Sequence, residues 1–306
     1  MTAPEETVAR RKPAATPRRP VAAKLPWNDK TGRLAPLKAV TFALLFAPAL
    51  WLLYRTFVIG LGARPITEII HFLGDWTIYL LLITLAITPA RRLFEWSKLI
   101  QVRRMVGVAA LCYILAHFTF YIVDSKFDLW FVTREIALRI YLTIGFVALI
   151  GLIALGVTST DGMIRRMGAK AWNNLHNLIY PITALGLLHY FMQSKVDVTQ
   201  PVLMSGFFFW LMGYRIMARW GYKEGLLPLL LLAVASAILT ALIEGAWYGL
   251  MTGIGFQRIF LTNFDFAVRI SPAWWVLALG IAVAVASLLR KRLIRSPPRG
   301  RIVGAA

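Results

Sequence analysis

The chain has one cysteine, Cys112, among its 306 residues. A single cysteine excludes an intrachain disulfide, a cysteine-ligated iron–sulfur cluster and a covalently attached haem c of the CxxCH type. The sequence also has no Walker loop and no GxGxxG fingerprint, so it carries no motif for nucleoside triphosphates or dinucleotides. We expect Cys112 itself to be a small buried hydrophobic residue.

Acidic residues are scarce, with 14 Asp and Glu against 34 Lys and Arg, which gives a net charge of +20. A basic chain can bind nucleic acid, but these charges lie between long apolar runs, and no soluble basic domain is present to hold phosphates. The hydrophobic fraction is 58% and the mean hydropathy is +0.65. This composition is typical of a membrane protein.

A membrane-spanning helix needs about 20 apolar residues. The sequence therefore predicts an all-α polytopic transmembrane helical bundle with eight candidate spans. Residues 1–38 are rich in Pro, Ala, Arg and Lys without an early apolar core, so we expect a disordered basic arm and no signal peptide. The eight candidates are Ala39–Leu61, Trp76–Ala90, Met105–Val123, Ile136–Val157, Ala171–Met192, Pro201–Ile216, Leu226–Ala246 and Trp274–Leu289.

The distribution of Lys and Arg predicts the orientation of these spans. With the N-terminus inside, most of the 34 basic residues fall in inside segments, and both termini are cytoplasmic. Arg139 then lies in the first turn of the fourth span, and we expect Glu244 in the seventh span to be interfacial. Only six basic residues fall outside, namely Arg64, Lys126, Arg134, Lys195, Arg258 and Arg269.

Four histidines are the residues best suited to cofactor binding. An imidazole in lipid needs a partner, and imidazoles at matched depths in neighbouring helices can hold haem iron between them. His117 and His189 are predicted at the same depth in the outer half of the membrane, whereas His176 lies in the inner half. His176 and His189 are expected in one helix, about 140° apart around its axis. Pro181 lies between them and should kink or unwind that helix.

Several short motifs between Leu61 and Met217 together resemble a known family. The chain is similar to the haem-binding membrane subunit of the periplasmic protein-methionine-sulfoxide reductase system, the MsrQ family, a small relative of the ferric-reductase and NADPH-oxidase transmembrane domain. The matching motifs are Leu61–Pro65, His71–Gly74, Ile87–Pro89 with Arg91, Arg103–Gly107, Ala116–His117, Thr158–Asp161, Trp172, Leu175–Asn177 and His189–Tyr190.

The resemblance implies an architecture and a function. It implies a six-helix haem-binding core over residues 39–220, with residues 221–306 as two additional helices and a basic tail. It also implies haem b, in one or two copies, and an association with FMN. The protein would be an electron-transfer subunit of the bacterial inner membrane. It would take electrons from the quinone pool and pass them to a periplasmic molybdopterin-containing methionine-sulfoxide reductase, which repairs oxidised proteins and carries out the sulfoxide chemistry itself.

The inner cofactor site stays open at the level of sequence. In the larger relatives a second histidine stands 14 residues before the first, and here that position is Arg103. Arg103 could ligate or hydrogen-bond a second haem, although a guanidinium is a poor metal ligand. Alternatively, His176 could hold five-coordinate haem, or the inner site could hold flavin.

Other charged and polar residues are candidates for cofactor contacts. Arg103, Arg104 and Arg91 could pair with haem propionates or a flavin phosphate. His71 could bind a propionate or a quinone carbonyl near the outer surface. The loops 124–135 and 193–200 flank the outer haem and are the expected docking surface for a periplasmic partner. The alternative function is a stand-alone transmembrane ferric or cupric reductase.

Overall fold

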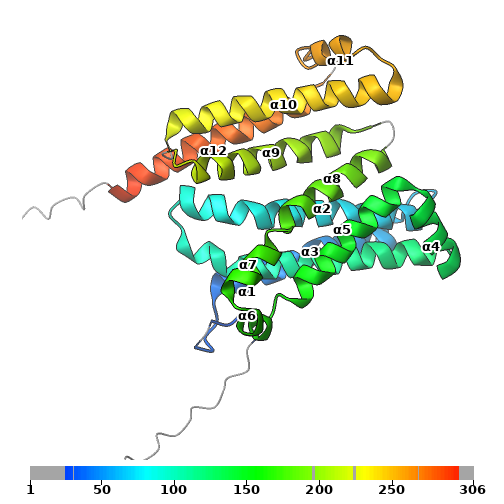
Figure 1. Cartoon of the computed structure of the whole chain (residues 1–306), viewed down its shortest axis with the longest axis horizontal. Helices are drawn as coiled ribbons and strands as arrows, with labels where there is room; N and C mark the ends of the chain where they lie inside the picture. The colour runs from blue at the N-terminus through cyan, green and yellow to red at the C-terminus, as the bar shows by residue number, and fades with distance from the viewer. Residues whose placement is uncertain (1–24, 30, 195–196, 223–224, 268, 296–306) are drawn as a thin grey trace, which may run out of the picture.

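The computed structural model describes residues 25–29, 31–194, 197–222, 225–267 and 269–295. Helices joined by short loops make up almost all of this part of the chain (Figure 1), which confirms the predicted all-α transmembrane class. The elements are α1 (Pro36–Tyr54), η1 (Arg55–Ile59), α2 (Pro65–Leu93), η2 (Ser97–Leu99), α3 (Ile100–Asp124), α4 (Leu129–Leu138), α5 (Ile140–Val157), α6 (Asp161–Met167), α7 (Ala169–His176), α8 (Ile179–Ser194), α9 (Thr199–Arg219), α10 (Leu226–Thr252), α11 (Phe256–Thr262) and α12 (Pro272–Arg295).

Seven stretches of the described chain are long and apolar enough to cross a membrane. The predicted fifth span, 171–192, is not one helix, because the chain breaks between α7 and α8 at Asn177 and Leu178. Pro181 causes the break: its ring excludes the carbonyl of the residue four positions earlier, and it has no N–H to donate. The prediction that His176 and His189 share a helix is therefore wrong. The seven stretches are Pro36–Ile59, Pro65–Leu93, Ser97–Asp124, Ile140–Val157, Thr199–Arg219, Leu226–Thr252 and Pro272–Ile294.

The predicted fourth span also begins later than expected. Arg139 is extended, with φ −110° and ψ 105°, and it separates α4 from α5 instead of lying in a helical turn. Its side chain pairs with Glu135 at 2.5 Å and donates to the Tyr141 hydroxyl at 3.1 Å. The short helix α4 is capped at its start by Asp128, whose carboxylate accepts the Phe131 N–H at 2.9 Å. The extended backbone of Arg139 thus divides residues that hydropathy alone assigns to one span.

Helix α2 lies at the centre of the bundle. It packs against α3 most extensively and also contacts α8 and α9, while α5 packs on α8. Its buried residues recur along the whole helix, from Ile69 to Leu93, because neighbours cover several of its faces. The end of the bundle that carries residues 91–104 is called the basic end below, and the opposite end is called the far end.

Helices α10 and α12 pack against each other and against α9, on one side of the bundle (Figure 1). Glu244 in α10 is buried, at 1% exposure, and it forms an ion pair with Arg269. Arg269 also donates to the Thr199 hydroxyl at 2.7 Å, where α9 begins. The expectation that Glu244 is interfacial is therefore wrong. The Glu244 carboxylate is tolerated in this apolar helix because the Arg269 guanidinium compensates its charge.

The first described residues, 25–29 and 31–35, contact one another before α1 begins. Asn28 and Leu34 form an isolated β-bridge, and the Asp29 carboxylate accepts hydrogen bonds from Thr31 and Arg33. Residues 25–29 and 31–38 of the predicted disordered arm 1–38 are therefore structured, and residues 1–24 and 30 lie outside the described residues. Residues 296–306 of the predicted basic tail lie outside them as well.

Candidate functional site

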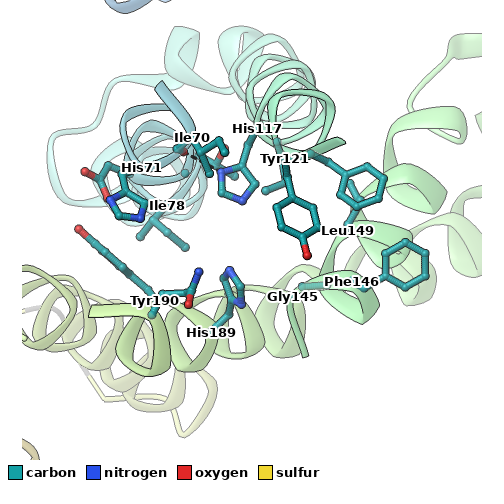
Figure 2. A pocket seen from close by; sticks show the side chains of 18 of the residues that line it. Ile70, His71, Ile78, His117, Tyr121, Gly145, Phe146, Leu149, His189 and Tyr190 are labelled. Atoms are coloured by element: carbon teal, nitrogen blue, oxygen red, sulfur yellow. Dashed lines mark hydrogen bonds between the residues drawn. The ribbon is translucent and has the colours of Figure 1, made fainter. Parts of the chain in front are cut away.

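Two histidines from different helices face each other in the interior of the bundle. His117 of α3 and His189 of α8 have ring centroids 6.5 Å apart and ring planes at 88° (Figure 2). They lie in a cavity of about 380 Å³ between α2, α3, α5 and α8. The matched depth predicted from the sequence therefore corresponds to a direct juxtaposition in space.

The two imidazoles are held in equivalent ways by the neighbouring helices. The Nδ1 atom of His117 lies 2.8 Å from the Ile70 carbonyl oxygen of α2, and that of His189 lies 2.8 Å from the Tyr141 carbonyl oxygen of α5. Each Nδ1 is therefore the protonated nitrogen, because a carbonyl oxygen only accepts. This tautomer leaves each Nε2 unprotonated, as a metal ligand must be.

A glycine follows each accepting carbonyl by four residues, on the same helix face. A Cβ added at Gly145 would lie 2.7 Å from Nδ1 of His189, and one added at Gly74 would lie 3.1 Å from Nδ1 of His117. Each ring thus rests on a helix backbone at a point where a side chain would displace it. We call each carbonyl–glycine pair, Ile70 with Gly74 and Tyr141 with Gly145, a histidine seat.

The residues present fit a haem held edge-on between the helices. With metal–nitrogen bonds of about 2 Å and ring radii of roughly 1 Å, two imidazoles on one metal have centroids about 6 Å apart. The observed 6.5 Å agrees with this arrangement. The cavity walls are mainly apolar, as a porphyrin face requires, and include Ile78, Leu81, Ile114, Phe118, Leu142, Phe146, Leu149, Leu152 and Ile182.

Polar residues gather where the cavity approaches the far end. His71 lies on this rim, close to Tyr190 (Figure 2), and Asp75 lines the same cavity. Asp75 of α2 and Tyr190 of α8 both line this part of the cavity. Sequence reasoning missed Asp75, although a carboxylate one helical turn after His71 in an apolar run is a detectable signal.

His176 does not join the two other intramembrane histidines. It ends α7 near the basic end, where its ring stacks on Trp172 with centroids 3.9 Å apart. Its Nε2 lies 3.2 Å from the Thr158 hydroxyl, and the Trp172 indole donates to the Thr158 carbonyl at 2.9 Å. In the described part of the chain, the four histidines therefore form one facing pair, one rim residue and one separate residue.

The three arginines predicted to meet a cofactor are at the basic end. Arg103 acts electrostatically on both His176 and Arg215, whereas Arg104 pairs with Asp161 at 2.5 Å. Arg91 lies in the last turn of α2 and does not line the histidine cavity. None of these arginines lines the cavity between His117 and His189, so they could act on a group bound there only through long-range electrostatics.

Arg215, which the sequence does not single out, lies within α9 and reaches inward. It donates to the Leu85 carbonyl at 2.5 Å and to the Leu211 carbonyl at 2.8 Å. Its guanidinium also lies over the Tyr180 ring, 5.3 Å from the centroid. Backbone carbonyls and an aromatic face thus surround this charge. Arg215 lies four residues before the end of α9 at Arg219, and its place in the sequence gives no indication of these contacts.

Comparisons with known proteins agree with this geometry. Residues 73–187 match the family described as "Ferric reductase like transmembrane component". Proteins named "Protein-methionine-sulfoxide reductase heme-binding subunit MsrQ" include one from Herminiimonas arsenicoxydans, 40% identical over 61% of this chain and 88% of the relative. Those from Rhodospirillum rubrum and Caulobacter vibrioides are 40% and 41% identical, over 62% and 56% of this chain and 89% and 82% of the relatives.

No solved structure matches the chain significantly. This chain, by contrast, covers most of the length of the MsrQ relatives, at about 40% identity. The ferric-reductase match spans α2 to α8, the helices that surround the facing histidines. The chain belongs to the MsrQ family of protein-methionine-sulfoxide reductase heme-binding subunits.

Proposed function

We propose that the protein is a membrane electron carrier in which His117 and His189 bind one haem b between α3 and α8. The observation that carries this proposal is the pair of histidine seats. Each seat fixes the tautomer of its imidazole and presents Nε2 to the same cavity. A histidine that merely fills space in an apolar bundle has no need of a second histidine 6.5 Å away.

A haem bound in this way supplies one-electron redox chemistry. His117 and His189 would both be committed to the iron, so the site would favour electron transfer over oxygen activation. The chain orients both imidazoles through the Ile70 and Tyr141 carbonyls, which also raise the basicity of the rings as ligands. The apolar walls exclude water from the macrocycle and from the ligand bonds.

We infer the direction of electron transfer across the membrane from the charge distribution. The basic end would face the cytoplasm, so the histidine cavity would lie toward the periplasmic side of the inner membrane. Electrons from the quinone pool would pass through the haem to a periplasmic molybdopterin-containing methionine-sulfoxide reductase. The relatives' name supports this partner class, since it describes them as heme-binding subunits of such a reductase. The chain itself would not bind the sulfoxide.

A second cofactor would lie nearer the basic end. His176 with Arg103 could serve a second haem, and Arg103, Arg104 and Arg91 could contact the phosphate of FMN. The docking surface for the periplasmic partner would comprise α4 and the loop before α9, which flank the cavity. The exposed side chains of α4 include the apolar Leu129, Trp130 and Leu138 together with Thr133 and Arg134.

A reduced-minus-oxidised spectrum of the purified protein, with haem and flavin quantified per chain, tests the proposal. His117→Ala and His189→Ala are each expected to abolish the far-end haem signal, whereas His176→Ala should spare it. Loss of all haem in His176→Ala, despite normal membrane insertion, would contradict the assignment. Reduction of ferric chelates without a protein partner would instead identify a stand-alone metal reductase.

A further inference from the structure

A second cavity, of about 680 Å³, lies between α1 and α3 and is separate from the histidine cavity. The two cavities lie on opposite sides of the α2–α3 layer. Leu73 and Ala116 line the second cavity, while their chain neighbours Gly74 and His117 line the first. We call the second cavity the α1–α3 groove.

The groove is long and apolar. Its residues on α3 run from Gln101 to Ala116, a rise of about 22 Å at 1.5 Å per residue. Half the hydrocarbon core of a bilayer is about 15 Å, so the groove covers at least the depth of one leaflet. Cys112 is exposed in this groove, contrary to its expected burial. The apolar lining is completed by Phe42, Leu45, Phe46, Ala49, Met105, Val108 and Ala109.

Helix α1 is attached to the bundle across this groove by one polar contact. The Tyr113 hydroxyl accepts the Ala49 N–H at 3.1 Å and donates to the Leu45 carbonyl at 2.9 Å. These are the two groups that would bond to each other in an unbroken helix, next to the kink at Pro48. Apart from Pro48 and Leu52, no residue of α1 is buried, so side-chain packing does not fill the groove.

The mouth of the groove at the basic end carries cationic donors. Lys38 and Arg104 line it together with Gln101. The Lys38 ammonium donates to the Asn28 carbonyl at 2.9 Å, and Arg104 pairs with Asp161 at 2.5 Å. An ammonium has three donors and a guanidinium five, so both keep donors for a further anion. With one carboxylate beside two cations, this mouth has a net positive charge.

We propose that the α1–α3 groove binds an anionic phospholipid, with its phosphate at Lys38 and Arg104 and an acyl chain along α3. The groove combines a leaflet-deep apolar channel with a cationic mouth at the membrane face where basic pockets between helices recognise anionic headgroups. A neutral headgroup would leave the positive charge of the mouth uncompensated. The bound lipid fills the space that separates α1 from the bundle, so it fixes α1.

Lipid retention by the full-length protein tests the proposal. The protein is exchanged into nanodiscs of phosphatidylcholine containing a minor fraction of phosphatidylglycerol, re-extracted, and the lipids carried through are measured by native mass spectrometry. Lys38→Gln with Arg104→Gln is expected to lose the retained phosphatidylglycerol. The matched control, Arg92→Gln with Lys98→Gln, removes the same charge at the same end from residues that do not line the groove, and should retain it.

A steric variant keeps the test independent of charge. Ala109→Trp places a large side chain inside the groove and is expected to abolish retention, whereas Leu115→Trp, on the lipid-facing surface of the same helix, should not. Haem content and thermal unfolding show that each variant is folded. Equal retention of phosphatidylcholine and phosphatidylglycerol by the unmodified protein would overturn the proposal. So would retention of a quinone in place of phospholipid, or equal loss in the charge control.

Discussion

The histidine seats make a graded prediction about three glycines. A Cβ at Gly145 would lie 2.7 Å from Nδ1 and 2.9 Å from Cε1 of His189, closer than real Cβ atoms approach other heavy atoms. Ordinary contact then requires the ring to move by about 0.7 Å, which is large relative to the tolerance of a metal–ligand bond. A Cβ at Gly74 would lie 3.1 Å from Nδ1 of His117, which a shift of a few tenths of an ångström relieves.

The magnitude follows from the cost of overpacking. Inserting a methyl group into a well-packed interior costs about 1–3 kcal/mol. If this cost falls on the haem-bound form, affinity for haem decreases roughly 5- to 150-fold. We expect Gly145→Ala at the upper end of this range and Gly74→Ala at the lower end. The control, Gly107→Ala in α3, meets nothing closer than 3.8 Å and should bind haem normally.

The assay is haem content per chain together with the rate of haem transfer to an apoprotein acceptor. The expected order of haem loss is Gly145→Ala, then Gly74→Ala, with Gly107→Ala equal to the unmodified protein. Wild-type haem content and transfer rate in Gly145→Ala would refute the seat geometry. An equal effect of all three substitutions would indicate general destabilisation of the bundle and would refute it as well.

Three further changes test other contacts. Arg269→Ala leaves Glu244 buried without its partner and should cost about 3 kcal/mol, measured as a lower thermal unfolding midpoint, whereas Glu244→Gln with Arg269→Gln should cost less. Tyr113→Phe removes two hydrogen bonds to α1 and should cost about 1–2 kcal/mol, with faster hydrogen exchange confined to α1. Hydrogen bonds from the hydroxyl and the backbone N–H of Thr199 hold the pKa of the Asp197 carboxyl below its ordinary value of 3.8. The stability that ionised Asp197 contributes is therefore fully present above pH 3.8. It is lost as the pH falls through the lower pKa of the folded state. Asp197→Asn should abolish this part of the acid dependence, measured as unfolding midpoints between about pH 3 and 7.

The level of a residue along the bundle was largely predictable from the sequence. Hydropathy locates the spans approximately, the distribution of basic residues predicts their direction, and a constant rise per residue converts position into a level along the bundle. For this reason His117 and His189 were expected at the same level, and the structure has them in contact across one cavity. The role of this pair as haem ligands stays a prediction.

Rotation about a helix axis and pairing between helices were not predictable in the same way. The seats at Ile70 and Tyr141 depend on which backbone face meets each histidine, and periodicity in uniformly apolar helices does not report it. The pairing of Glu244 with Arg269 joins residues from separate elements and is visible only after the helices are packed. The break before α8 was signalled by Pro181, but its extent depended on how α7 packs near α5.

The histidine cavity is placed off-centre along the bundle. His189 lies five residues before the end of α8, and the cavity extends to Gln200 at the start of α9. In the proposed orientation an electron that entered at the basic end, from the second cofactor proposed there, would cross most of the membrane before it reached the haem, and little afterwards. Moving one charge across a full membrane potential of 100 mV changes its free energy by about 2.3 kcal/mol. For an electron, outward movement is the favourable direction when the cytoplasm is negative. The energised state of the cell would therefore act chiefly on filling the haem with electrons, while their delivery to the partner would be almost independent of membrane voltage.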